Sequence, residues 1–307
     1  MDTPRAVALG FFDGVHIGHG ALLRRTRAAA DRLAIPAAAM SFDAHPSRLL
    51  CAAPAPLLST MDERTLLMQH LYGMDEVIFE HFDRAMMEMP WEAFFEEYLV
   101  GRLRAAHIVC GHDYRFGFHG EGTAALLQAA CIARGIGCEI VPQVTLDGVR
   151  VSSTVIREQL ERGDAETARR FLGHPHLVSG IVSHGSHLGH TLGFPTANLP
   201  FEPDVLVPPH GVYAARAELD GHSYDAVVNI GVHPTAGSLP APVLEANLLD
   251  FRGSIYGRTL HVWLYKMLRP EQRFASLDAL KAQIAHDADT TRAYFNTKTC
   301  LKSLKDF

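Results

Sequence analysis

Short apolar runs alternate with stretches of helical periodicity along the first half of the chain. Runs typical of buried strands lie at residues 6–10, 37–42, 107–110 and 138–141. Apolar residues recur at helical spacing over about 20–33, 60–71, 91–99 and 126–130. Thr60 and Glu63 have the spacing of a capping box. This alternation predicts a parallel sheet covered by helices, which binds ligands at the carboxyl ends of its strands.

The pattern changes after about residue 172, where Gly and Pro become frequent and the apolar runs shorten. Asp220-Gly221 separates two apolar runs, which predicts a β-hairpin. Residues 260–264 alternate like a strand with one solvated face, and a helix capped by Ser276 is expected over about 277–288. The second half is therefore predicted to be an antiparallel β-barrel with a C-terminal helix. The predicted domains are 1–172 and 173–307.

Composition narrows the class of protein. The chain has 307 residues, of which 48% are apolar and 20% charged, and this suits two soluble globular domains. No stretch approaches the roughly 18 apolar residues of a membrane span, and the signal-peptide pattern is absent. Five scattered cysteines without a C-x-x-C pair favour a reducing compartment, so a cytoplasmic protein is predicted. A net charge of -6 argues against a nucleic-acid partner, no membrane partner is expected, and the oligomeric state is left open.

A candidate site follows the first predicted strand, where residues 10–19 read G-F-F-D-G-V-H-I-G-H. His16 and His19 flank Gly18 at the expected start of a helix, where free backbone N–H groups attract an anion. Imidazole donors there can stabilise charge on a transferring phosphoryl group, and Gly14 and Gly18 let the backbone approach a phosphate. The H-x-G-H pattern is typical of nucleotidylyltransferases, although each histidine alone is more often an ordinary surface residue.

Two later segments add candidate ligands. Residues 111–117, G-H-D-Y-R-F-G, follow a predicted strand and place an acid, aromatic rings and a base on one loop. Residues 150–157, R-V-S-S-T-V-I-R, place hydroxyls and two guanidinium groups at a helix start, which suits a second phosphate clamp. Helix capping is the alternative explanation for the two serines.

Together these three segments resemble the FMN adenylyltransferase module of prokaryotic bifunctional FAD synthetases, over about residues 5–172. The resemblance implies a Rossmann-like nucleotidylyltransferase domain in which an FMN phosphate attacks the α-phosphorus of ATP and pyrophosphate leaves. It implies catalytic roles for His16 and His19 and flavin contacts for Asp113 and Phe116. The implied ATP and phosphate ligands are Gly14, Gly18, Arg150, Ser153, Thr154 and Arg157.

A second candidate site lies where a glycine-studded loop around Gly185 leads into the P-T-A-N sequence at 195–198. The oxygens of Thr196 and Asn198 suit Mg²⁺, which one or two protein oxygens commonly hold together with nucleotide phosphates. Both residue types also form ordinary turns, so this segment alone leaves the choice open.

Residues 177–293 as a whole resemble the riboflavin kinase module. The resemblance implies that Gly185, Thr196 and Asn198 bind the ATP phosphates, and that Thr196 and Asn198 also hold Mg²⁺. It implies that Glu245 accepts the proton of the riboflavin 5′-hydroxyl and that Arg269 contacts the flavin. Without the resemblance, Glu245 could equally be a structural acid paired with an arginine.

The sequence departs from this family at four positions where arginine is common. Histidine stands there instead, at His119, His174, His190 and His233. A largely uncharged imidazole lacks the donor fork of arginine, so His190, beside the P-T-A-N loop, puts kinase efficiency in question.

The two resemblances together imply phosphorylation of riboflavin to FMN and adenylylation of FMN to FAD, with ATP and Mg²⁺. The alternatives are a chain with only the adenylyltransferase active, or a catalytically silent flavin-binding protein.

Overall fold

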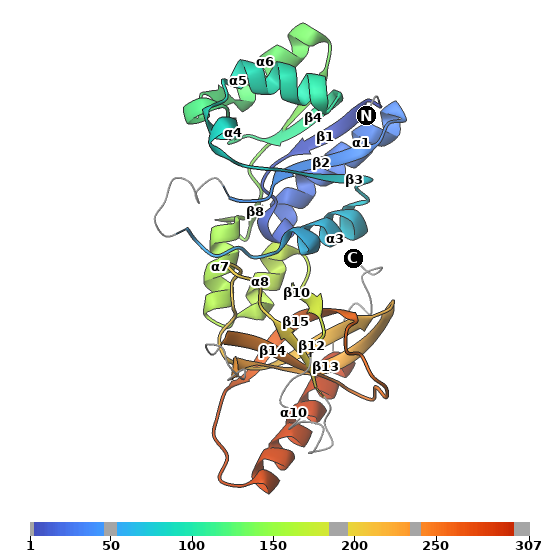
Figure 1. The fold of residues 1–307 in the computed structure, drawn as a ribbon, viewed down its shortest axis with the longest axis vertical. Helices are drawn as coiled ribbons and strands as arrows, with labels where there is room; N and C mark the ends of the chain where they lie inside the picture. The colour runs from blue at the N-terminus through green and yellow to red at the C-terminus, as the bar shows by residue number, and fades with distance from the viewer. Residues whose placement is uncertain (1–2, 46–53, 184–195, 234–240, 298–307) are drawn as a thin grey trace. The chain divides into compact units, whose positions relative to one another are not determined.

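The computed structural model describes residues 3–45, 54–183, 196–233 and 241–297. The chain divides into two compact units (Figure 1). The first unit consists of Met1–Pro56 and Arg64–Ser153, and the second of Leu57–Glu63 and Thr154–Phe307. The predicted functional boundary between residues 172 and 173 stays a prediction.

The first unit is built on a five-stranded sheet of order β3-β2-β1-β4-β7 in which all neighbours are parallel. Its strands are β1 (Arg5–Leu9), β2 (Ala37–Phe42), β3 (Glu76–Glu80), β4 (Ala105–Gly111) and β7 (Gly137–Val141). Its helical segments are η1 (Asp13–Val15), α1 (Ile17–Leu33), α4 (Arg84–Glu88), α5 (Trp91–Ala93), the π-helix η2 (Phe94–Arg102), η3 (Phe118–Gly120) and α6 (Ala124–Arg134). Two small ribbons pair β5 (Arg115–Phe116) with β6 (Gly122–Thr123) and β8 (Thr145–Leu146) with β9 (Val149–Arg150). The predicted α/β class is confirmed.

Local chemistry accounts for the ends of these helices. Thr60 and Glu63 form the predicted capping box at α3 (Met61–Tyr72): the Thr60 N–H donates to Glu63 Oε2 at 2.8 Å and the Glu63 N–H to Thr60 Oγ1 at 3.2 Å. The helix expected from residue 20 starts at Ile17 instead, because the His16 imidazole accepts from a backbone N–H and acts as an unusual cap. Strand β3 was not predicted, since acids at both its ends hide the short apolar run.

The second unit is a six-stranded antiparallel sheet of order β10-β15-β12-β13-β14-β11. A bridge between Ser183 and Asn198 joins the two outer segments, so the sheet curls into a nearly closed barrel. The strands are β10 (His176–Ile181), β11 (Ala197–Pro200), β12 (Gly211–Leu219), β13 (His222–His233), β14 (Ala241–Leu248) and β15 (Thr259–Pro270). The helices are α7 (Ser153–Glu161), which begins in the first unit, α8 (Ala165–Leu172) and α10 (Leu277–Thr297). The predicted barrel with a C-terminal helix is confirmed.

The predicted hairpin joins β12 to β13 through Asp220 and Gly221, whose φ angles of 48° and 78° are those of a tight left-handed turn. Ser276 caps α10 by accepting from the Ala279 N–H at 3.2 Å, as expected. The helix itself runs to Thr297, well past the predicted end near residue 288. No helix among the described residues combines the length and hydropathy that a membrane crossing requires.

Candidate active sites

The first candidate site lies at the carboxyl edge of the parallel sheet. Strands β1 and β4 are neighbours; β1 is followed along the chain by β2 on one side, and β4 leads to β7 on the other. Residues 10–19 follow β1 and residues 111–117 follow β4. Both candidate loops therefore leave the sheet at its topological switch point, where sheets of this type bind ligands.

The turn after β1 has an uncommon backbone. Phe12 and Val15 are buried and have φ angles of 58° and 41°, and Gly14 between them has a φ of 73°. Left-handed geometry at a β-branched valine is costly, so the surrounding structure must impose it. Strain of this kind concentrates where a backbone has to present groups in a fixed arrangement.

His16 and His19 form one stacked pair. Their ring centroids lie 3.5 Å apart with an interplanar angle of 11°, and His16 Nδ1 accepts from the His19 N–H at 3.1 Å. A side chain at Gly18 would meet the His16 ring at 3.0 Å, so glycine makes room for that ring. The glycine, the cap and the stacking together hold both imidazoles at the start of α1.

The charge state of His19 is set by its surroundings. Burial, the neighbouring His16 and the positive charge of Arg64 hold the pKa of His19 well below its usual value. His19 Nδ1 is buried and has no hydrogen-bond partner among the described residues. In the free protein His19 is therefore neutral at pH 7, with one ring nitrogen unsatisfied.

Contacts within the first unit join the three sequence motifs. Ser153 Oγ donates to the Asp13 carbonyl at 3.0 Å, which ties the third motif to the strand-to-helix turn. Arg150 pairs with Asp113, which ties the third motif to the loop after β4. Two separate contacts thus tie the third motif to each of the other two. Thr154 and Arg157 follow on α7, Thr154 exposed and Arg157 half-buried.

Phe116 packs among aromatic rings. It is 7% exposed and packs with Tyr114, Phe94 and Trp91 at centroid distances of 5.5, 5.6 and 6.2 Å. His119 follows in the exposed turn η3 with a φ of 53°. Phe116 therefore anchors its loop in the core, and its predicted flavin contact stays a prediction.

The second candidate site lies on the barrel. Asn198 of β11 and Glu245 of β14 stand directly opposite one another in the antiparallel ladder, and Asn229 of β13 faces Glu245 from the other side. Directly opposite residues on neighbouring strands share a face of the sheet, with Cβ atoms about 5 Å apart. The barrel therefore brings the predicted base beside a predicted metal ligand from a segment 47 positions earlier in the chain.

Asn198 is only 7% exposed, and its carbonyl accepts from the N–H and Oγ of Ser183 at 2.9 and 3.1 Å. These two bonds fix the strand on which the asparagine stands. Thr196 lies two residues earlier, half-buried. Both side chains offer oxygen atoms, as a hard cation requires.

Arg269 is held by a carboxylate of α10. Its Nη2 donates to Asp287 Oδ2 at 2.8 Å and its Nε to both carboxylate oxygens at 3.2 Å, while the Gln283 amide donates to Oδ1 at 2.8 Å. This bidentate pair fastens the end of β15 to the helix. The predicted contact of Arg269 with flavin stays a prediction.

Several predicted positions lie outside the described residues, namely Gly185 and His190, as does the side chain of His233. His174 is described and is 2% exposed, with its ring edge against Trp263 at 6.1 Å. Its Nδ1 lies 2.8 Å from the Pro175 carbonyl, which makes it a core residue of the second unit.

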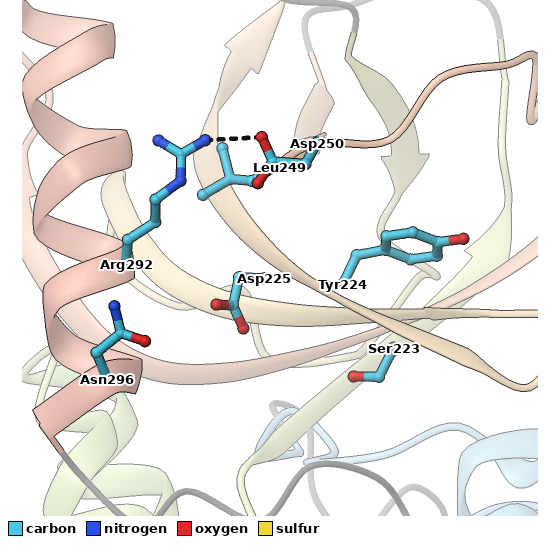
Figure 2. Close-up of a pocket in the computed structure, with 7 residues that line it drawn as sticks. All are labelled: Ser223, Tyr224, Asp225, Leu249, Asp250, Arg292 and Asn296. Carbon is cyan, nitrogen blue, oxygen red and sulfur yellow. Dashed lines mark hydrogen bonds and ion pairs between the residues drawn. The ribbon is translucent and has the colours of Figure 1, made fainter.

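Figure 2 shows a pocket of about 380 Å³ on the barrel, between β13, the end of β14 and α10. None of the predicted site residues lines it, and Arg292 crosses it to pair with Asp250 at 3.0 Å. The lining residues are Ser223, Tyr224, Asp225, Leu249, Asp250, Arg292 and Asn296.

Comparison with known proteins agrees with this two-site arrangement. Two family models match the chain, FAD synthetase over residues 1–155 and riboflavin kinase over residues 172–295. The bifunctional riboflavin kinase/FMN adenylyltransferase of Haemophilus influenzae is 39% identical over 95% of this chain and 94% of that protein. The protein of the same name from Bacillus subtilis is 34% identical over 94% and 92%. A crystal structure of a Streptococcus pneumoniae protein described as a macrolide-efflux protein is 30% identical, with a TM-score of 0.81 and 95% of each chain covered.

The chain combines a parallel sheet, with a histidine-bearing turn at its switch point, and a barrel with a carboxylate beside an amide, and the two matched families make it a transferase. The chain belongs to the family of bifunctional riboflavin kinase/FMN adenylyltransferases. It is thus an enzyme with both activities, and ATP is a substrate of each.

One residue and two contacts at these sites were not predicted from the sequence. Arg64 carries no motif, and its position just after the capping box was the one available cue. The partnership of Asp287 with Arg269 connects a helix to a strand end, and the bond from Ser153 to Asp13 spans 140 residues. Contacts over such separations follow from the fold and leave no local pattern.

Proposed function

We propose that the strand-to-helix turn of the first unit carries the transfer of the adenylyl group to FMN. An FMN phosphate oxygen attacks the α-phosphorus of ATP, the new P–O bond forms, and the bond to the leaving pyrophosphate breaks. His16 and His19 donate to the phosphoryl oxygens, while Gly14, Gly18 and the start of α1 supply backbone N–H groups. The observation that supports this most is the pair of contacts that tie the third motif to the turn after β1 and to the loop after β4.

The remaining residues of the first unit take supporting roles in this proposal. Arg150, Ser153, Thr154 and Arg157 bind ATP phosphates from the start of α7. Asp113, paired with Arg150, and Phe116, through the loop that it anchors, face the flavin. This function is assigned to residues 1–172 and the kinase function to residues 173–307.

On the barrel, Glu245 accepts the proton of the riboflavin 5′-hydroxyl as that oxygen attacks the γ-phosphorus of ATP. The new P–O bond forms, the bond from the γ-phosphorus to the bridging oxygen breaks, and ADP leaves. A carboxylate held within hydrogen-bond reach of the hydroxyl contributes roughly 10²–10⁴-fold by general-base catalysis. The register that places Glu245 opposite Asn198 supports this assignment, because it sets the base beside the proposed phosphate ligands Thr196 and Asn198. Gly185 and Arg269 complete the proposal as ligands of ATP and flavin.

The oxygens at this site fit Mg²⁺. No cluster of three or more His, Cys, Asp or Glu side chains suited to a metal occurs in the part of the chain that the structure describes. Thr196 and Asn198 offer two neutral oxygens, and Mg²⁺ typically takes few protein ligands beside nucleotide phosphates. When bound, the ion would neutralise charge on the transferring phosphoryl group.

Reciprocal inactivation tests the two assignments. We expect Glu245→Gln to lower FMN formation from riboflavin by about 10²-fold or more while FMN adenylylation persists, and His16→Ala to do the reverse. Glu218→Gln, another half-buried carboxylate on a barrel strand, and His70→Ala on the surface of α3 are matched controls. Products are separated by chromatography after incubation with ATP, Mg²⁺ and either riboflavin or FMN.

If either variant leaves both reactions unchanged, the catalytic role assigned to that residue is wrong. FAD from FMN without FMN from riboflavin, in the unaltered protein, would favour the chain with one active site and make His190 the first position to replace with arginine.

We also infer a reducing, cytoplasmic location. Cys110, Cys131 and Cys138 are free thiols, although Cys131 and Cys138 are close enough to share a hydrogen bond. Fractionation of cells that express the tagged protein tests this inference.

A further inference from the structure

Arg64 is a fully buried cation at the first candidate site. It stands in the first turn of α3 with 0% of its surface exposed. Its Nη1 donates to the Phe11 carbonyl at 2.9 Å, to Ser41 Oγ at 2.9 Å and to the Phe42 carbonyl at 3.1 Å. One guanidinium nitrogen therefore links the turn after β1 to the end of β2.

Two aromatic rings lie against the guanidinium. Its central carbon lies 4.6 Å from the ring centroid of Phe11 and 4.8 Å from that of Phe79. Nε and Nη2 are buried and have no hydrogen-bond partner among the described residues. Within the same residues Arg64 forms no ion pair, and the carboxylates that act on it, Asp13 and Asp43, do so at longer range.

A buried charge in this state is expensive. Burial lowers the pKa of Arg64 to about 10, against the opposing influence of Asp13 and Asp43, so the side chain stays cationic at neutral pH. Removing an ion from water costs several kcal/mol unless partners replace the lost hydration. The hydrogen bonds of Nη1 replace part of that hydration, but Nε and Nη2 have no partner among the described residues, which points to an anionic ligand.

The position of Arg64 identifies that ligand. Phe11, whose carbonyl and ring both contact the guanidinium, belongs to the turn that carries His16 and His19. The positive charge of Arg64 also acts on His19 itself. The positive charge of Arg64 therefore acts on the turn to which an anionic triphosphate would bind.

We propose that Arg64 is a positioning residue for adenylyl transfer, which fixes the strand-to-helix turn through the Phe11 carbonyl and supplies the positive charge that the ATP triphosphate neutralises. This inference rests on the proposed function of the turn. It separates two roles of one side chain. The hydrogen bonds of Nη1 shape the turn, and the positive charge, which no ion pair among the described residues neutralises, attracts the nucleotide.

The test compares Arg64→Met, which removes the charge, with Arg64→Lys, which keeps it. A hydrogen bond to a charged group is worth roughly 1.5–3 kcal/mol, so Arg64→Met should raise the KM for ATP in FMN adenylylation about 10- to 150-fold. Arg64→Lys should recover most of that loss in KM while kcat stays reduced. Riboflavin phosphorylation, in the other unit, should be unchanged in both variants.

The pH profile supplies a readout that a structural role would not move. Since Arg64 and His16 both lower the pKa of His19, loss of the Arg64 charge should shift the acidic limb of kcat/KM for adenylylation to higher pH. Asp13 and Asp43 are present in every variant and do not distinguish them. Arg64→Lys should leave the limb where it is.

Arg5→Met is the matched control. Arg5 is a buried arginine at the opposite end of β1, 5% exposed and paired with Glu76 at 3.0 Å. Its loss should lower thermal stability without moving the KM for ATP or the acidic limb. Should Arg64→Met fail to fold by circular dichroism, Arg64→Gln, which keeps a donor for the Phe11 carbonyl, takes its place.

An unchanged KM for ATP and an unmoved acidic limb in the folded neutral variant would overturn the proposal, and so would Arg64→Lys behaving like Arg64→Met. Failure of the underlying site is recognised separately. If His16→Ala still forms FAD from FMN, the turn is not the adenylylation site; if His16→Ala is inactive and Arg64→Met is normal, only the role of Arg64 is wrong.

Discussion

Arg269 has two possible roles at the end of β15: it stabilises the barrel through its ion pair with Asp287, and in our proposal it contacts flavin. Replacing it tests the first role and, with a second substitution, separates the two. Replacing Arg269 by Met leaves the Asp287 carboxylate, with 5% of its side chain exposed, with the Gln283 amide as its one hydrogen-bond donor among the described residues. Breaking a buried ion pair by removing one partner costs about 3–5 kcal/mol, and the remaining amide places the expected loss near the lower limit.

The assay follows unfolding of the barrel alone. The chain has two tryptophans, Trp91 in the first unit and Trp263 in the barrel, where it is 4% exposed. In a Trp91→Phe background, fluorescence therefore reports on the second unit. With a urea dependence of roughly 1–3 kcal/mol per molar, a loss of about 3 kcal/mol moves the midpoint down by roughly 1–3 M.

The double variant Arg269→Met with Asp287→Leu separates the two roles. Since both charges are gone, its stability should return most of the way to that of the parent. If Arg269 also contacts flavin, the KM for riboflavin stays raised in the double variant although stability has recovered. A shift below about 0.3 M in Arg269→Met, or a double variant no more stable than the single one, would refute the reasoning about the pair.

Three further predictions concern the fold. Burial and the neighbouring His174 lower the pKa of His176 to about 4, so between pH 6.5 and 4 His176 is protonated in the unfolded chain and neutral in the folded one. The free energy of unfolding, measured by urea titration relative to His176→Phe, should therefore fall by about 3 kcal/mol as the pH is lowered over that range. Gly221→Ala, where a Cβ meets nothing within 4 Å but φ is 78°, should cost about 1 kcal/mol. Thr60→Ala should cost about 1 kcal/mol through the lost cap, measured by thermal unfolding, and a cost near zero would contradict the capping-box geometry.

Periodicity and turn chemistry predicted most of the fold because both act over a few residues. The run at 37–42 became β2 with the same bounds, and Asp220-Gly221 made the predicted hairpin. The start of α1 was missed because histidine is an uncommon cap, and β3 because acids interrupt its apolar pattern. The sites were predicted where motifs mark them, but the contacts that join the motifs, such as Ser153 with Asp13, depend on the complete fold.

The residue types at the two proposed sites differ because the two nucleophiles differ. The nucleophile in adenylylation is a phosphate that already carries negative charge and needs no base, so a centre made of His16, His19 and a buried guanidinium suits it: what must be overcome is repulsion between anions. The nucleophile in the kinase reaction is a neutral hydroxyl, which must lose a proton as it attacks, and there a carboxylate in register with Asn198 is the appropriate group. An unpaired carboxylate beside the attacking phosphate would add repulsion to the first reaction, and a site without a base would not take the proton of the hydroxyl in the second. The two chemistries therefore favour separate units over one shared centre.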